Sequence, residues 1–468
     1  MADKSIRATS AVIDAMSTDW AMIDALMDGT AAMRVAGKAF LPQFPQETDK
    51  SYGARLNTAV LHPVFKRTVL VNASRPFSRP LTLDEKTPAK IAEWTHDVDL
   101  QGSALAGFSN HAMGACLAKG LYGVLVEYPK AEDIRTQAQE KAAGARPYCI
   151  QYRANSILGW RTAQASAGLQ LSQLRLLECA EVEDGAYGMK SVEQVRLLEP
   201  GKWSTYRQND KDKDQWDLVD EGTTTIDFIP FVFFYGIRKG FGIGASPLLD
   251  LAFQNVEHWQ NASDQQTILH VARVPILFGR QLGDKEITIG AGSIVSGENE
   301  HSDLKYVEHT GAAIEAGAES MSDLEDRMRT TGAELISLKP GYATATEVSS
   351  DGEATKSLLQ QICENFEESI SLVLNYMAAW VKEDQTAEVE LYKDFGVATS
   401  SDPTALSSAK KSGAISAQTH FEELQRRDVI SQDLTWEDEQ KRIAADTKQA
   451  TSDAAAHAAA LAKATPDA

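Results

Sequence analysis

The chain has 468 residues, of which 43% are hydrophobic, and it carries a formal net charge of −20. This length allows two to four domains with sizeable cores, and the acidic balance argues against a protein that grips nucleic acid through a basic face. The four cysteines form no CxxC pair, we see no signal peptide, and no apolar run reaches the roughly 18 residues of a membrane span. We therefore expect a cytosolic chain with reduced thiols and no membrane segment.

The first part of the chain is predicted to be mainly helical. Residues 19–37 have the spacing of one amphipathic helix, which ends before the two prolines of LPQFPQ. Residues 54–72 indicate a helix interrupted at Pro63, and residues 85–121 are largely helical. A strand-like run, GVLVEYP, follows, and then a polar helix or surface excursion over residues 131–145.

From Tyr148 to Ile237 the pattern changes to strands. Short runs rich in β-branched and aromatic residues are separated by turn signals. We predict an antiparallel sheet that the first helices and a later helix cover, so the fold class is α+β.

A glycine-rich run, GFGIGA, occupies residues 240–245 between a strand and a helix, which is the context of a phosphate-binding loop. Its glycines do not meet the GxGxxG spacing, and no second βαβ unit follows. We interpret the run as a tight entry turn into the helix, and a nucleotide-binding enzyme that uses this loop stays open as an alternative.

Other catalytic and metal-binding motifs are absent from the sequence. It contains no GxxxxGK[ST], no GxSxG and no HExxH. His301 and His309 lie eight residues apart without cysteines, which is a weak zinc signal. We expect no catalytic site, no metal site and no cofactor.

A long helix is predicted over residues 247–273, with a length of roughly 40 Å. Ser246 can cap it, Pro247 suits its first position, and Pro275 ends it. Its middle, Asn261–Gln266, is polar nearly all round. Because a helix buried in one core is not polar on every face, we expect this part to meet a wetter setting or neighbouring copies of the chain.

A small strand-rich insert and a second helix come next. The insert runs from Pro275 to His309 in short segments broken by glycines. The second helix is predicted over about Ala318–Thr331, with Gly332 as its C-cap. Its apolar stripe consists of Met321, Leu324 and Met328.

A third helix is predicted over about Glu353–Val381, after a non-helical piece with a Pro340–Gly341 turn. A strand at AEVELYKDFG is then expected to return to the sheet. The third helix has a stripe at helical spacing, formed by Leu358, Ile362, Phe366, Ile370, Val373, Met377 and Trp380.

The C-terminal part is predicted to contain two or three short helices. One ends at Gly413, Ser416 caps the next, and Thr435 with Asp438 opens the last. The Ala-rich tail beyond them has strong helix propensity and little to bury.

The order long helix, insert, helix, loop and long helix resembles that of the portal proteins of tailed bacteriophages. The segments that carry the resemblance are ASPLLDLAF, VPILFG and GYATATE, with NSILGWR upstream and SAKKSGAISAQTHFEELQRR downstream. They are loose segments and contain no short catalytic motif. The resemblance covers about residues 50–445.

The resemblance implies a ring, usually of twelve copies, at one vertex of the capsid, with a central channel for DNA packaging and ejection. The implied partners are the large terminase or packaging motor, the tail adaptor proteins and the major capsid protein, in a virion assembled in the bacterial cytoplasm. The implied architecture is a wing (1–240), a first stem helix (241–275), a clip (276–311), a second stem helix (312–331), a tunnel loop (332–351), a wing helix with a returning strand (352–400) and a helical crown (401–468).

The resemblance also assigns roles to individual residues. Arg273, Lys339 and Tyr342 are expected near the channel, in transient contact with phosphate; ordinary surface or packing roles remain open for each. The residues expected at a stem or oligomer interface are Asn261, Gln265, Gln266, Met321, Leu324 and Met328. Another virion structural protein, such as a head–tail connector, stays open as an alternative.

Overall fold

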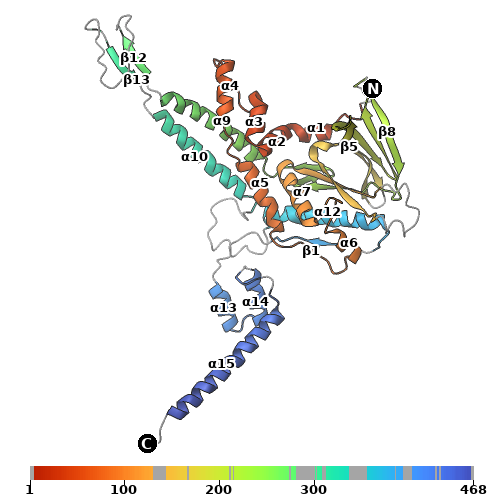
Figure 1. Ribbon diagram of the computed structural model, residues 1–468, viewed down its shortest axis with the longest axis vertical. Helices are drawn as coiled ribbons and strands as arrows, with labels where there is room; N and C mark the ends of the chain where they lie inside the picture. The colour runs from red at the N-terminus through yellow and green to blue at the C-terminus, as the bar shows by residue number, and fades with distance from the viewer. Residues whose placement is uncertain are drawn as a thin grey trace. The chain divides into compact units, whose positions relative to one another are not determined.

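The computed structural model divides into two compact units, Met1–Phe395 and Gly396–Ala468, and each is considered by itself (Figure 1). Both helices and antiparallel strands occur, so the α+β class is confirmed. Within the described part of the chain, no helix combines the length and the apolarity that a membrane crossing needs. The described residues are 5–129, 144–165, 168–209, 212–213, 215–273, 276–280, 301, 303–307, 312–336, 356–384, 386–393, 403–426, 429–431 and 434–464.

The N-terminal part is helical, as predicted, but residues 19–37 form two helices instead of one. Gly29 separates α2 from α3 with a φ of +92°, a conformation that suits glycine and not a continuing helix. The break predicted at Pro63 is confirmed, because α4 and α5 lie on either side of it. The helices are α1 (Ala11–Met16), α2 (Trp20–Asp28), α3 (Thr30–Ala36), α4 (Asp49–Thr58), α5 (Val64–Ser74), α6 (Ala89–Trp94) and α7 (Leu105–Lys119).

The strands predicted as one sheet form two sheets. The first has the order β3-β2-β9, and the second is the meander β4-β5-β6-β7-β8; all neighbours are antiparallel. The chain leaves the first sheet after β3 and returns to it only with β9, so the meander between them pairs separately. The strands are β2 (Leu121–Glu127), β3 (Tyr148–Arg153), β4 (Ile157–Ala165), β5 (Gly168–Asp184), β6 (Gly188–Glu199), β7 (Lys202–Gln208), β8 (Trp216–Thr223) and β9 (Phe231–Tyr235).

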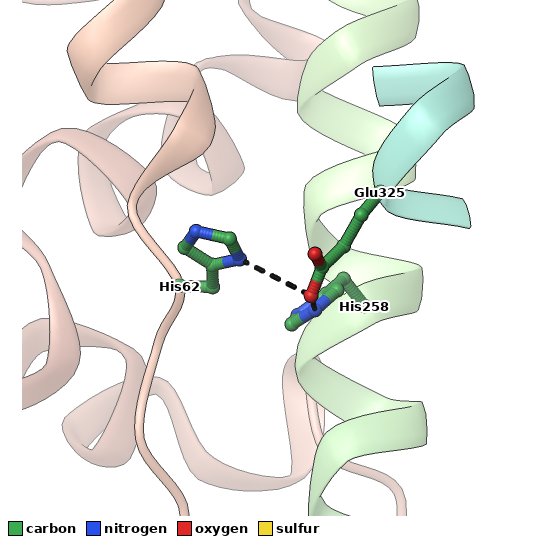
Figure 2. A group of neighbouring side chains, drawn as sticks. All are labelled: His62, His258 and Glu325. Carbon is green, nitrogen blue, oxygen red and sulfur yellow. Dashed lines mark hydrogen bonds and ion pairs between the residues drawn. The ribbon is translucent and has the colours of Figure 1, made fainter. Parts of the chain in front are cut away.

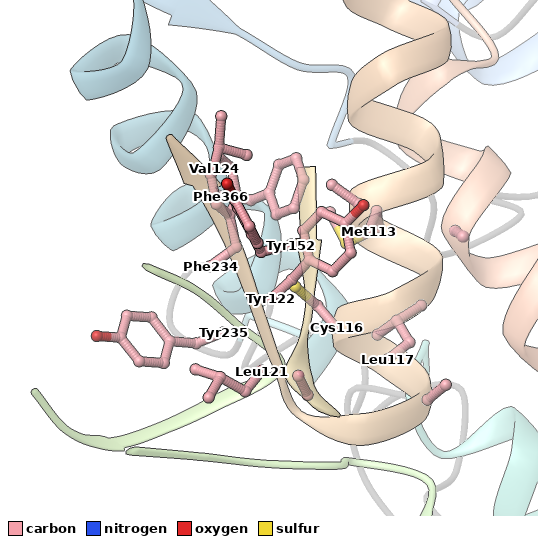
Figure 3. Close-up of a cluster of buried hydrophobic side chains, with 14 of the residues drawn as sticks. Met113, Cys116, Leu117, Leu121, Tyr122, Val124, Tyr152, Phe234, Tyr235 and Phe366 are labelled. Carbon is pink, nitrogen blue, oxygen red and sulfur yellow. The ribbon is translucent and has the colours of Figure 1, made fainter. Parts of the chain in front are cut away.

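The core lies where the three-stranded sheet meets helices and the second sheet (Figure 3). Successive side chains of a strand point to opposite faces. On β9, Phe234 packs against Phe366 of α12 (Leu358–Trp380) with ring centroids 4.9 Å apart, whereas Phe233 meets Trp160 of β4 at 5.2 Å. The helix stripe predicted for α12 is therefore confirmed as a core-facing stripe, and its residues Ile362, Phe366, Ile370, Val373 and Met377 are buried.

Two long helices, α9 (Leu249–Ala272) and α10 (Ala312–Ala333), pack side by side, and the strands β12 (Ile276–Arg280) and β13 (Asp303–Val307) pair at their far end (Figure 1). The Ser246 hydroxyl accepts a hydrogen bond from the Leu248 amide, as expected of a cap, but α9 begins at Leu249, two residues after the predicted first position, Pro247. The predicted C-cap at Gly332 is wrong, because α10 continues through it. A Cβ at Gly332 would lie 3.2 Å from the Thr68 side chain, so glycine lets α5 approach here.

The predicted return of a strand to the main sheet is also wrong. Strand β14 (Val389–Glu390) pairs instead with β1 (Thr82–Leu83) in a separate two-stranded sheet. This pairing is short, and α12 supports it through the Ser371 hydroxyl, which accepts a hydrogen bond from the Val389 amide at 3.0 Å.

The second unit contains α13 (Pro403–Lys411), α14 (Ala417–Arg426) and α15 (Trp436–Ala464). Gly413 follows the first helix with a φ of +77°, and Ser416 accepts a hydrogen bond from the Thr419 amide, as predicted. Thr435 caps α15 by accepting from the Asp438 amide. The Ala-rich tail continues α15 as one helix, which agrees with its helix propensity.

The cysteines differ sharply in their surroundings. Cys116, Cys149 and Cys363 are buried, and Cys179 on β5 is exposed. Burial raises the pKa of the Cys149 and Cys363 thiols to about 12 and raises that of Cys116 as well. The three buried thiols are therefore protonated at neutral pH.

Candidate functional site

The helix pair formed by α9 and α10 joins most of the residues singled out from the sequence. Its inner side is apolar, with Leu251 and Trp259 of α9 and Leu324 and Met328 of α10 all fully buried. Polar contacts run along the pair: Gln265 donates to the Ile314 carbonyl at 2.9 Å, and Gln254 donates to the Thr331 hydroxyl at 3.3 Å.

Polar residues in and next to the middle of α9 find partners within the chain. Arg55 of α4 reaches Asp264 at 3.5 Å and binds Glu47 through two hydrogen bonds of 2.9 and 2.8 Å. Gln260 donates to the Phe40 carbonyl at 3.0 Å. The hydrogen bonds from Arg55 hold the pKa of the Glu47 carboxyl below its usual value, whereas burial raises that of Asp264.

The predicted interface residues differ in how open they are to a second copy. Leu324 and Met328 are fully buried inside the chain, where they hold α10 against α9. Met321, Asn261 and Gln265 are half-buried, and Gln266 is exposed. The surface available to a neighbour therefore includes the polar residues of the set more than the apolar ones.

The predicted channel residues are only partly described. Arg273 is exposed directly after α9, where its amide donates to the Leu269 carbonyl at 3.0 Å. Lys339 and Tyr342 lie outside the described residues, as do Pro340–Gly341 and His309.

The exposed side of the helix pair is rich in carboxylates. Arg327 and Arg329 are the exposed basic residues within the described range of α10, and both are paired: Arg327 with Glu257 at 3.8 Å, and Arg329 with Glu325 and Asp326. Glu325 and Arg329 are thus paired one helical turn apart. The exposed carboxylates of the two helices are Asp250, Glu257, Glu315, Glu319, Asp323 and Asp326, and Glu334 directly follows α10.

Beside this acidic side, two histidines and a glutamate converge from three segments (Figure 2). His62 lies between α4 and α5, His258 on α9 and Glu325 on α10. The Glu325 Oε1 atom is 3.3 Å from His258 Nε2 and 3.8 Å from His62 Nδ1, and the two imidazole rings are 5.1 Å apart. Among the described residues, these three side chains form the group that could hold a metal ion.

Buried polar contacts fix this arrangement. Asn255, one turn before His258 on α9, is fully buried; its amide donates to the His62 carbonyl at 2.9 Å, and its carbonyl oxygen accepts from the Phe65 amide at 2.9 Å. Asn255 thereby ties the segment after α4 to α9. Burial and the neighbouring His258 lower the pKa of the His62 imidazole, an effect that Glu325 opposes.

Sequence reasoning missed this cluster. The three residues are far apart in the chain and form no motif with a fixed spacing. In the sequence, His258 is one of several polar residues of the same helix, and nothing sets it apart. Only the packing of α10 on α9 and the anchoring of His62 by Asn255 bring them together.

The glycine-rich run forms a β-hairpin, β10 (Ile237–Gly240) with β11 (Ile243–Ala245), so the predicted tight turn is present. Gly242 has a φ of +71°, and a Cβ there would meet the Trp160 ring at 2.4 Å. A Cβ at Gly244 would meet the Gly120 carbonyl oxygen at 2.0 Å. Both glycines therefore face protein groups, whereas a phosphate-binding loop turns its open backbone toward a ligand.

Comparison with known proteins gives one family match and several structural likenesses. The domain of unknown function DUF4055 matches residues 247–381, the region from the start of α9 to the end of α12. No curated protein matches the chain significantly.

The structural likenesses are to chains of gene transfer agent (GTA) particles. A chain of the virion of the native particle aligns with 12% identity and a TM-score of 0.39, covering 86% of this chain and 95% of the other. A chain of the neck of the empty particle, computed with C6 symmetry, aligns with 13% identity and a TM-score of 0.41, covering 84% and 96%. A chain of the neck of the native particle, computed with C12 symmetry, aligns with 12% identity and a TM-score of 0.39. This alignment covers 83% of this chain and 97% of the other.

Proposed function

We propose that this chain is a structural subunit of a head-to-tail connector ring, a portal protein of a phage-like virion, and that it catalyses no reaction. The observation that carries the proposal is the antiparallel helix pair α9–α10, which ends in the β12–β13 hairpin and is followed in sequence by the core helix α12. This is the element order on which the sequence resemblance to portal proteins rests. The helix pair would be the stem, and the hairpin would be the clip.

The charge of the helix pair supports a conduit for DNA. A surface dense in carboxylates repels phosphate within a Debye length of about 8 Å at physiological salt, so a duplex could pass without sticking. Arg273, Lys339 and Tyr342 would then give brief contacts where the acidic wall is interrupted. Surface carboxylates also keep a protein soluble, and this general role would account for them without a channel.

Exposed apolar side chains support assembly with further copies. Phe253 and Ile268 on α9 are 50% and 37% exposed, and Leu372 on α12 is 40% exposed. Leu372 also lines an open groove of about 480 Å³ between α12, β5 and β9, with Phe228, Phe241 and Tyr376 among its walls. Neighbouring subunits of a ring would cover such surfaces, because ring contacts join two different faces of one subunit.

The proposed partners follow from the proposed ring. The hairpin end of the stem would dock the packaging motor and later the tail adaptors, and the major capsid protein would surround the ring at its vertex. DNA would run through the channel.

The first experiment is native mass spectrometry of the purified full-length chain together with negative-stain images. We expect a closed ring of about a dozen copies with a central hole. Phe253→Asp should lower the fraction of rings, because it places a charge in a predicted subunit contact. Tyr187→Asp is the matched control, since Tyr187 is fully exposed in the turn between β5 and β6.

A monomer at every concentration, with no ring under any condition, would contradict the ring. For the channel, deletion of Pro340–Gly341 should impair DNA packaging or retention more than ring assembly. Loss of the ring itself in that variant would contradict a tunnel-loop role for this segment.

A further inference from the structure

We infer that His62, His258 and Glu325 form a binding site for a divalent transition-metal ion of the zinc class. The inference concerns a different property from ring formation and does not rest on it. It starts from the convergence of three metal-ligating side chains from three separate segments at one point (Figure 2).

The spacing of the ligand atoms suits a tetrahedral ion. With metal–ligand bonds of about 2.0–2.1 Å, two ligands of a tetrahedral site lie about 3.3 Å apart. The distance from His258 Nε2 to Glu325 Oε1 is 3.3 Å, and that from His62 Nδ1 to the same oxygen is 3.8 Å. All three atoms lie within 4.8 Å of one another, so a small inward movement of His62 would complete the set.

The kinds of ligand select the kind of ion. Two imidazoles and one carboxylate are the protein ligands of open zinc sites, in which water takes the fourth position, whereas magnesium and calcium prefer all-oxygen sets. His62 is half-exposed, so water can reach the fourth position.

Neighbouring residues position the ligands and influence how strongly they would attract a cation. His258 is 4% exposed, and its Nε2 faces Glu325. Its Nδ1 has no hydrogen-bond partner among the described residues. Asn255 holds the backbone of His62 in place. Arg329 lies 3.5 Å from Glu325 Oε2, and Arg67 acts on His62; both are positive and weaken the attraction for a cation.

A bound ion would add a cross-link between three segments of the chain. It would tie the segment between α4 and α5 to both helices of the pair. Since a metal that binds only the folded chain adds its binding energy to folding, the ion would raise the midpoint of thermal unfolding.

The test is a titration of the metal-free full-length protein with Co²⁺, followed by visible absorption, with Zn²⁺ as competitor. We expect one Co²⁺ per chain with the intense visible bands of a tetrahedral site, and Zn²⁺ should displace it. His62→Ala and Glu325→Gln should each weaken binding by more than about tenfold, the lower bound for losing even an outer-shell partner. His270→Ala is the matched control, because His270 is an exposed histidine of α9, the helix that also carries His258.

The choice of variants keeps the test decisive. The His62 side chain is half-buried and lies outside the helices, so we expect His62→Ala to keep the fold, which circular dichroism checks directly. Absence of stoichiometric Co²⁺ binding would overturn the inference, as would equal binding by wild type and His62→Ala. Ring formation by the same samples is scored separately, so the two proposals fail independently.

Discussion

The helices α9 and α12 have nearly the same length and are stabilised in opposite ways. Helix α12 carries a continuous apolar stripe that faces the core, and it begins with a capping box in which Ser357 and Gln360 bond each other's backbone amides. Helix α9 also buries Leu251 and Trp259, but its polar residues depend on individual partners. Asp264 meets Arg55, Asn255 donates to the His62 carbonyl, and Gln265 donates to the Ile314 carbonyl. An apolar stripe keeps its stability under many hydrophobic substitutions, whereas a set of paired polar groups loses stability when one partner is removed.

The largest effect should come from the core of α12. Phe366→Ala is expected to lower the free energy of unfolding by about 3–5 kcal/mol, because it removes a fully buried ring that packs on Phe234. Chemical denaturation measures the change. Leu372→Ala on the same helix is the control: its side chain is 40% exposed, so the loss should stay below about 1.5 kcal/mol. Equal losses would refute the core assignment.

Next in size should be the polar support of α9. Arg55→Gln is expected to cost about 3 kcal/mol, because it leaves the Glu47 carboxylate buried without its cation. The same denaturation experiment applies. Lys38→Gln is the control, since its contact with Asp49 is exposed and spans 3.8 Å, and it should change stability by less than about 0.5 kcal/mol.

The same ion pair predicts an acid dependence. Arg55 lowers the pKa of Glu47 from its ordinary value of 4.5, so the folded chain holds this proton less tightly than the unfolded chain does. The stabilisation is therefore complete above pH 4.5 and is lost as the pH falls through the lowered value. The stability difference between wild type and Arg55→Gln should shrink over that window. A difference that does not change with pH would show that the pair contributes through packing alone.

A smaller effect is expected at the start of α12. Ser357→Ala should cost about 1 kcal/mol, since it removes the hydroxyl that accepts from the Gln360 amide. Ser357→Asp restores an acceptor and should recover most of the loss. If the aspartate variant were no more stable than the alanine variant, the cap would not be the cause.

The smallest effect on stability should come from Gln266, which is exposed on α9. Gln266→Ala should change the free energy of unfolding by less than about 0.5 kcal/mol. If Gln266 lies in a subunit contact, the variant should nevertheless form fewer rings in native mass spectra. Unchanged ring formation would remove it from the predicted interface.

The sequence predicts α12 well and α9 only in part. Apolar residues at helical spacing indicate directly which side of a helix is buried, so the core-facing residues of α12 could be predicted individually. The polar run Asn261–Gln266 records only that water or polar groups are near, and it could not show that Arg55 and the Ile314 carbonyl supply them. That the run also meets neighbouring copies of the chain stays a prediction.

Contacts between distant segments were equally hard to predict at Gly332 and at the histidine–glutamate cluster. Gly332 signals a helix end in sequence, but here it serves close packing against Thr68, which depends on a neighbouring helix. The cluster His62, His258 and Glu325 leaves no spacing signal because its ligands come from three segments. Local chemistry was predictable at the caps Ser246, Ser416 and Thr435, where the cause lies within four residues.

The uneven burial of the cysteines gives a means of counting subunits. A thiol-reactive dye at neutral pH should mark Cys179 and leave the three buried, protonated thiols untouched. Each chain would then carry one fluorophore without any engineered change. The number of bleaching steps from a single immobilised particle would equal its number of subunits, and the natural sequence would supply its own stoichiometry probe.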